Sequence, residues 1–383
     1  MSATCDSTAE RITGYLGFSC HDANPFVTFR NPADLASWTM PVLELLIIGG
    51  AVFALVHALR RLRRDGDPTN LALWFASLVY LFVTEPPLYF PEWFGLQKQF
   101  GFIFAHNVFS VQFMYDRLPL YIVAIYPALS QLVYELVRVT GVFRRRGALA
   151  GAVCAALVCQ VFYEVFDQLG PQLKWWAWNL DNKTNHPLLA SVPLNSIMLF
   201  SSVSFGVITY LTARLIAQPT WNGRRLSVPS LVGRTVLVGA LAPLCMGIAS
   251  VPSAVFGGNH PNVSAQTVVL TIEIALLWII GGTILVRQWR DNRTTSQPEQ
   301  LNAFVRIYPA LYLAVFAVFW ASALPDFIGA RCGYTGKNTP IGNAPYTLLC
   351  FLAAAACVAA VLVPARRRSA DRTADLPARA AVQ

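Results

Sequence analysis

Two carboxylates one helical turn apart, followed by a cluster of indoles, are the residues of this chain best suited to chemistry. Glu164 and Asp167 end an apolar run, and Trp175, Trp176 and Trp178 come soon after them. Side chains at i and i+3 share one face of a helix, so both acids can face one pocket. Acids beside aromatic surface could bind and protonate an apolar, unsaturated lipid. The alternative is an aromatic belt at the membrane boundary with ordinary loop carboxylates.

Further polar groups fall at the same predicted level, at the ends of apolar runs. Glu85 ends one run and Asp116 opens another. Loss of hydration at this depth favours the uncharged carboxyl group, which can then act as a general acid. An ion pair would instead make the group inert, and Arg117 directly follows Asp116. The candidate catalytic residues are Asp167, Glu164, Glu85 and Asp116, and the candidate substrate-binding residues are Trp175, Trp176, Trp178, Tyr115, Asn195 and His106.

The elements that must position these residues are membrane-spanning helices. Of the 383 residues, 55% are hydrophobic and 13% are charged, which is too apolar for a soluble domain. A helix needs about 20 apolar residues to cross the hydrocarbon core. The sequence therefore predicts an all-α polytopic transmembrane bundle with about nine spans, at 41–59, 70–89, 117–139, 148–166, 189–217, 228–250, 265–286, 304–324 and 345–364.

The distribution of positive charge sets the predicted topology. The net charge is +9, and the basic clusters follow every second span, at 60–64, 144–146, 224–225, 287–290 and 366–368. This is the positive-inside pattern of a multi-pass protein of the cell membrane, and it argues against nucleic acid as a partner. Residues 1–40 are expected outside and a disordered tail, 365–383, in the cytoplasm.

One apolar stretch and the cysteines need separate treatment. Residues 101–114 are too short to span, so we expect an interfacial or re-entrant segment. A cleavable signal peptide is not expected, because residues 1–40 have no continuous apolar core. Cys5 and Cys20 could form a disulfide in an oxidising compartment. No metal or cofactor is expected, because short metal, phosphate-loop and dinucleotide motifs are missing from the sequence.

Two segments within about residues 80–200 resemble the membrane-integral carotenoid hydratase family (carotenoid biosynthesis proteins). Asp167 precedes Trp176 and Trp178 by nine and eleven residues, and the sequence SVPLN at 191–195 opens the next apolar run. A second segment, FSVQFMYDRLPLY at 109–121, has the Phe/Tyr-rich stretch before a Pro-Leu, with Glu85 upstream. Gln168 and Ser191 replace the Pro and Gly of the family pattern, and residues 228–364 look like additional spans.

The resemblance implies hydration of the terminal double bond of a lycopene-like or bacterioruberin-type chain. A carboxyl group would protonate the alkene, and aromatic faces would stabilise the cation that water then captures. An apolar isoprenoid lipid would be the substrate, beside the bilayer itself. Two alternatives stay open: a lipid or small-molecule transporter using Glu273 and Arg234 within the membrane, and a non-catalytic accessory protein.

Overall fold

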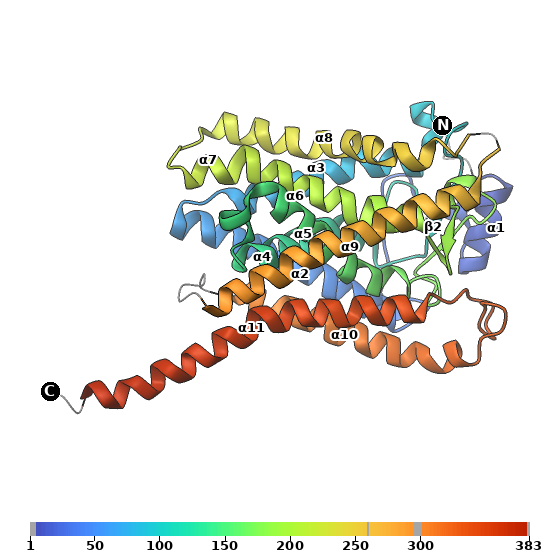
Figure 1. The fold of residues 1–383 in the computed structure, drawn as a ribbon. Coiled ribbons are helices and arrows are strands. Elements are labelled where there is room, and N and C mark those ends of the chain that lie inside the picture. Colours follow the sequence, from blue (N-terminus) through green and yellow to red (C-terminus); the bar gives the residue numbers. More distant parts are fainter. Residues whose placement is uncertain (1–4, 259, 295–300, 381–383) are drawn as a thin grey trace.

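The computed structural model describes residues 5–258, 260–294 and 301–380, and in this part of the chain nine helical spans are long and apolar enough to cross a membrane. They run lengthwise in one bundle (Figure 1). The prediction of an all-α polytopic bundle is therefore confirmed. The spanning helices are α2 (Thr39–Asp65), α3 (Thr69–Tyr89), α4 (Leu120–Val139), α5 (Val142–Asp167), a composite span (Ser196–Trp221), α8 (Val228–Ala254), α9 (Val263–Thr294), α10 (Ala303–Ile328) and α11 (Ala344–Ala380).

The composite fifth span departs from regular α-helix. It consists of π-helix η5 (Ser196–Ser204), α6 (Phe205–Thr212), π-helix η6 (Ala213–Ala217) and α7 (Gln218–Trp221). We expected this span to begin at residue 189, but residues 188–193 instead form a hairpin of β6 (Leu188–Leu189) and β7 (Val192–Pro193). The wide turns of η5 matter for the site, because π-helical turns re-aim side chains and are frequent at functional positions.

Short strands and turns cover one end of the bundle. β2 (Phe104–His106) pairs antiparallel with β5 (Trp176–Trp178), which places His106 opposite Trp176. β3 (Val111–Phe113) lies between β1 (Val27–Phe29) and β4 (Leu118–Pro119). Residues 101–114 thus contribute β2 and β3 and form no spanning helix. Single turns complete this layer: η1 (Cys20–Asp22), η2 (Pro32–Asp34), η3 (Pro91–Phe94) and η4 (Lys183–Asn185).

The N-terminal segment carries a helix that hydropathy did not predict. In α1 (Ser7–Leu16), Asp6 caps the first turn by accepting a hydrogen bond from the Ala9 amide at 2.8 Å, and Gly17 ends the helix in the left-handed region. Ile12 and Leu16 pack on Ala177 of β5. Cys5 and Cys20 form a disulfide, with 5.7 Å between their Cα atoms. This segment is therefore attached to the strands it covers.

The centre of the bundle is formed by α4 and α5. Within their most apolar windows, 89% and 78% of the residues are buried, compared with 11% for α9. The N- and C-termini lie at opposite ends of the bundle (Figure 1), as an odd number of crossings requires. Which end faces the cytoplasm stays a prediction. The disordered tail expected at 365–383 also stays a prediction, because side chains beyond residue 363 lie outside the described part.

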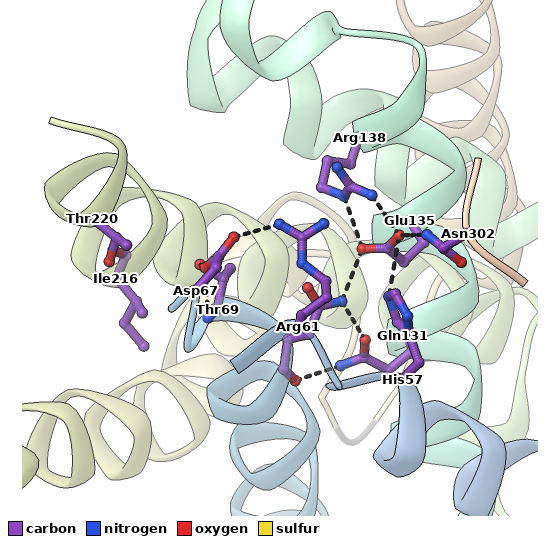
Figure 2. A network of polar contacts seen from close by, with 11 residues as sticks. His57, Arg61, Asp67, Thr69, Gln131, Glu135, Arg138, Ile216, Thr220 and Asn302 are labelled. Carbon is purple, nitrogen blue, oxygen red and sulfur yellow. Dashed lines mark hydrogen bonds and ion pairs between the residues drawn. The ribbon is translucent and has the colours of Figure 1, made fainter. Parts of the chain in front are cut away.

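A buried ion-pair network fixes the end of the bundle away from the strands (Figure 2). Arg138 donates from Nε to Glu135 at 2.8 Å, and the Nε2 atom of His57 lies 3.4 Å from the same carboxylate. Asn70 and Asn302 donate to Glu135 at 2.9 and 2.5 Å. These contacts join α2, α3, α4 and the start of α10. Glu135 is therefore paired with Arg138 one turn away and acts as a structural acid.

Close contact between α2 and α10 gives a stability prediction. A Cβ atom at Gly50 would overlap the ring of Tyr308, whereas a Cβ at the neighbouring Gly49 meets open space. Small residues let membrane helices approach closely. We expect Gly50→Ala to destabilise the protein by about 1–3 kcal/mol through overpacking, and Gly49→Ala to leave stability unchanged or slightly raised. Thermal unfolding in detergent measures both, and equal midpoints for the two variants would contradict this packing.

Candidate functional site

A cavity of about 510 Å³ lies between α3, α4, α5, η5 and α8, at the strand-covered end of the bundle. Its volume is in the range typical of small-molecule sites. Aromatic and aliphatic side chains form most of its lining, together with a few polar groups. At one end of the lining, residues 183–186 meet the loop between α8 and α9, where Lys183 donates to the Gly258 carbonyl at 3.1 Å.

Two carboxyl groups from different helices line this cavity. Glu85 comes from the last turn but one of α3, and Asp167 is the last residue of α5; they are 5% and 2% exposed. Tyr126 donates a hydrogen bond to Glu85, and Ser196 donates to Asp167 at 3.1 Å. Within the described part of the chain, neither acid forms an ion pair with a lysine or arginine. Both acids thus depend on hydroxyl donors.

The aromatic wall follows from the pleat of β5. Residues i and i+2 of a strand point to the same face, so Trp176 and Trp178 both line the cavity. Trp176 packs on Phe166 with 4.9 Å between ring centroids. It is seated over Gly170, where any Cβ would overlap its ring. The two-residue spacing that the sequence analysis noted is therefore the spacing that presents two indoles to one space.

Six of the ten predicted site residues line this cavity and four do not. Those that line it are Glu85, Asp167, Trp176, Trp178, His106 and Asn195. The strand pleat that aims Trp176 and Trp178 inward turns Trp175 into the core, where its indole donates to Thr39 at 3.0 Å. Its expected role in substrate binding is therefore not supported by its position.

The other three residues also differ from expectation. Glu164 lies one turn before Asp167 on α5. It is fully buried within the protein and accepts a hydrogen bond from Gln168 at 3.1 Å. Asp116 forms an ion pair at 2.6 Å, and its partner is Arg30 rather than the neighbouring Arg117. Tyr115 lies with Asp116 beside a second, smaller cavity. These residues surround the main cavity without lining it.

His106 links two tyrosines in the wall of the cavity. Its Nε2 atom lies 3.1 Å from the Tyr89 hydroxyl, and its Nδ1 atom lies 3.2 Å from the Tyr121 hydroxyl. Burial lowers the pKa of His106 to about 3, so the imidazole is neutral at physiological pH. A neutral ring has one donor and one acceptor nitrogen. Its neighbours must therefore differ in role, with one tyrosine donating and the other accepting.

Sequence reasoning missed the hydroxyl groups that serve the two acids. Tyr126 and Ser196 both line the cavity, but they come from α4 and η5, and nothing in their local sequence sets them apart. Two tyrosines could have been identified, because Tyr89 follows Glu85 by four residues and Tyr163 precedes Asp167 by four, the spacing that places two side chains on one helix face. Both tyrosines line the cavity.

The residues of the alternative transport hypothesis lie elsewhere. Arg234 donates to the Leu215 carbonyl and to Ser230, and Glu273 is half-buried on α9. Arg234 and Glu273 form no ion pair with each other among the described residues, and neither residue lines the main cavity. One group of potential metal ligands occurs among the described residues, Cys5, Glu10 and His21. The sulfur of Cys5 belongs to the disulfide, so this group does not fit a metal ion.

The buried state of His106 predicts a pH-dependent stability. The unfolded chain binds a proton near pH 6.5, whereas the folded protein resists protonation down to about pH 3. Stability is therefore complete above pH 6.5 and falls as the pH is lowered, by about 1.4 kcal/mol per unit. We expect His106→Gln to flatten this slope between pH 6.5 and 4 in detergent unfolding experiments. The exposed His21→Gln is the control, and parallel slopes for both variants would contradict the assignment.

Comparison with known proteins does not assign this chain to a family. No family model matches the chain, and no curated protein or solved structure matches it either. The chain is therefore described by its own features. It is a multi-pass helical membrane protein with an aromatic cavity at one end of its bundle, and two carboxyl groups from different helices line that cavity.

Proposed function

We propose that this chain is an enzyme of the cell membrane that acts by acid catalysis on a double bond of an isoprenoid- or carotenoid-type lipid, with hydration as the reaction. One observation carries the proposal. Glu85 and Asp167 line the same apolar, aromatic cavity, and neither forms an ion pair with a cation of the described chain. Acids without a cationic partner in an apolar site cost stability, and an acid that a membrane protein retains at such a cost is a candidate functional residue.

The surroundings of the cavity favour a lipid substrate. Met246, Gly247 and Ser250 of α8 line it, while Leu244 and Ile248 of the same helix are exposed. In a membrane these exposed side chains face the acyl chains, so α8 alone separates this part of the cavity from lipid. An apolar chain could enter beside α8 without crossing water. The lining offers such a chain dispersion contacts and few hydrogen bonds, which suits a hydrocarbon end group.

The proposed reaction needs an acid, a base and a surface that tolerates positive charge. Protonated Asp167 gives its proton to one carbon of a trisubstituted alkene, and a tertiary cation forms at the other. The faces of Trp176 and Trp178 stabilise this cation through their quadrupoles. Water then bonds to the cation, and Glu85 takes the proton that the water loses. The product is a tertiary alcohol, and the enzyme regains its starting charge when the proton returns from Glu85 to Asp167.

The proposal predicts the behaviour of two isosteric variants. Asp167→Asn and Glu85→Gln keep the shape of the site but cannot exchange protons, so product formation should fall by roughly 10²–10⁴-fold. The control is Asp326→Asn, which changes an exposed acid paired with Lys337 at 2.7 Å. The test expresses each protein in cells that accumulate lycopene-type carotenoids and measures, by mass spectrometry, pigment heavier by one water. Protein level in the membrane is quantified alongside.

Two outcomes would overturn the proposal. One is that the wild-type protein forms neither a hydrated product nor any other altered lipid in cells supplied with several isoprenoid classes. A lipid that copurifies with the wild-type protein unchanged would then indicate a carrier. The other is product formation that Asp167→Asn and Glu85→Gln leave intact, which would move the chemistry away from this cavity.

A further inference from the structure

A second cavity shares a wall with the main one. Tyr89, Phe104 and His106 line both cavities. The second is much smaller, about 30 Å³, and a single water needs about 10–15 Å³ in this measure. It therefore has room for about two waters and for no larger ligand. Its other walls come from α1 (Thr13), the Cys5–Cys20 disulfide, and Asp116 with Arg117.

Asp116 gives this small cavity an acceptor that the protein does not satisfy. The side chain is 5% exposed. Its Oδ2 atom accepts from Arg30 at 2.6 Å, whereas its Oδ1 atom has no hydrogen-bond partner among the described residues. Buried carboxylate oxygens are costly when unpaired. A water in the adjoining space would supply the missing donor, and such polar, roomy sites are where buried waters occur.

The backbone holds Asp116 in place at a conformational cost. Met114, Tyr115 and Asp116 all have left-handed φ angles, of 55°, 57° and 56°, a region that L-residues avoid in succession. Gln112 stabilises this turn by donating to the Asp116 carbonyl at 2.8 Å. Its side-chain oxygen also accepts from Arg30 at 2.6 Å. The contacts of Arg30 and Gln112 therefore fix the carboxylate at the edge of the small cavity.

We propose that the small cavity is a water site and that it supplies the main cavity through the wall formed by Tyr89 and His106. The use of this water in hydration rests on the proposed function, whereas the water site itself does not. The chemistry requires such a route, because a lipid chain that fills the main cavity excludes bulk water while each turnover consumes one water molecule. The Tyr89 hydroxyl and the His106 ring, 3.1 Å apart, offer hydrogen bonds at the crossing.

Hydroxyl-radical footprinting by X-ray radiolysis tests the water site on the full chain in detergent. Radicals formed from bound water label the side chains beside it, so His106 and Tyr89 should be labelled several-fold faster than Tyr134, a buried tyrosine that lines neither cavity. Ala105→Leu fills the small cavity only, because Ala105 lines that cavity and not the main one. This variant should reduce labelling of both residues several-fold relative to the wild type.

A matched variant separates loss of water from damage to the strands. Ala177 faces Ala105 across the β2–β5 ladder but lines neither cavity, so Ala177→Leu should leave labelling unchanged. If Ala105→Leu does not fold, Thr13→Leu fills the same space from α1. Wild-type labelling of His106 and Tyr89 no faster than that of Tyr134 would overturn the water site, whatever the enzyme assay gives.

Turnover tests the second part of the proposal. With the lipid substrate saturating, Ala105→Leu should lower kcat several-fold and leave KM unchanged, because the variant removes water and not lipid contacts. Unchanged kcat in a variant that has lost the label would show that water reaches the main cavity by another path. Absence of product from wild type would instead count against the proposed function, while footprinting still decides whether water occupies the small cavity.

Discussion

Burial of a carboxyl group in a membrane protein has to be compensated, and the two ends of this bundle compensate it differently. At one end the Glu135 carboxylate accepts hydrogen bonds from Arg138, Asn70 and Asn302. This arrangement satisfies both oxygens of the Glu135 carboxylate. At the other end Glu85 and Asp167 accept hydrogen bonds from hydroxyl groups and face a cavity. The contrast in partners, rather than the residue type, separates the structural acid from the candidate catalytic acids.

The strand-covered end of the bundle also contains unfavourable backbone conformations. Three successive left-handed residues position Asp116, and π-helical turns open the start of the fifth span beside Ser196. Strain of this kind persists only where surrounding contacts enforce it. For residues 114–116, the pairing of β3 with β4 on either side and the side chains of Gln112 and Arg30 supply those contacts. The opposite end has the paired network around Glu135. Rigid packing and the candidate site therefore occupy different ends of one bundle.

The spans and part of the site could be predicted from the sequence, each for a different physical reason. Apolar length alone predicts a spanning helix, so all nine were identified. Trp176 and Trp178 could be placed beside Asp167 because they are neighbours in the chain. The exclusion of Trp175 depends on the strand pleat, which three residues of sequence do not reveal. The partner of Asp116 is Arg30, far away in sequence, and the donor to Glu85 is Tyr126 on another helix. Contacts between segments were beyond the reach of local patterns.

The surroundings of the two acids argue for different roles under the proposed mechanism. The Tyr126 phenol donates to Glu85, and a donor of this kind stabilises a carboxylate, which suits the group that takes the proton from water. Asp167 receives a single serine hydroxyl and has buried Glu164 one turn before it on α5. Glu164 does not line the cavity, so under the proposed mechanism Asp167 is the one of these two acids that can reach a substrate.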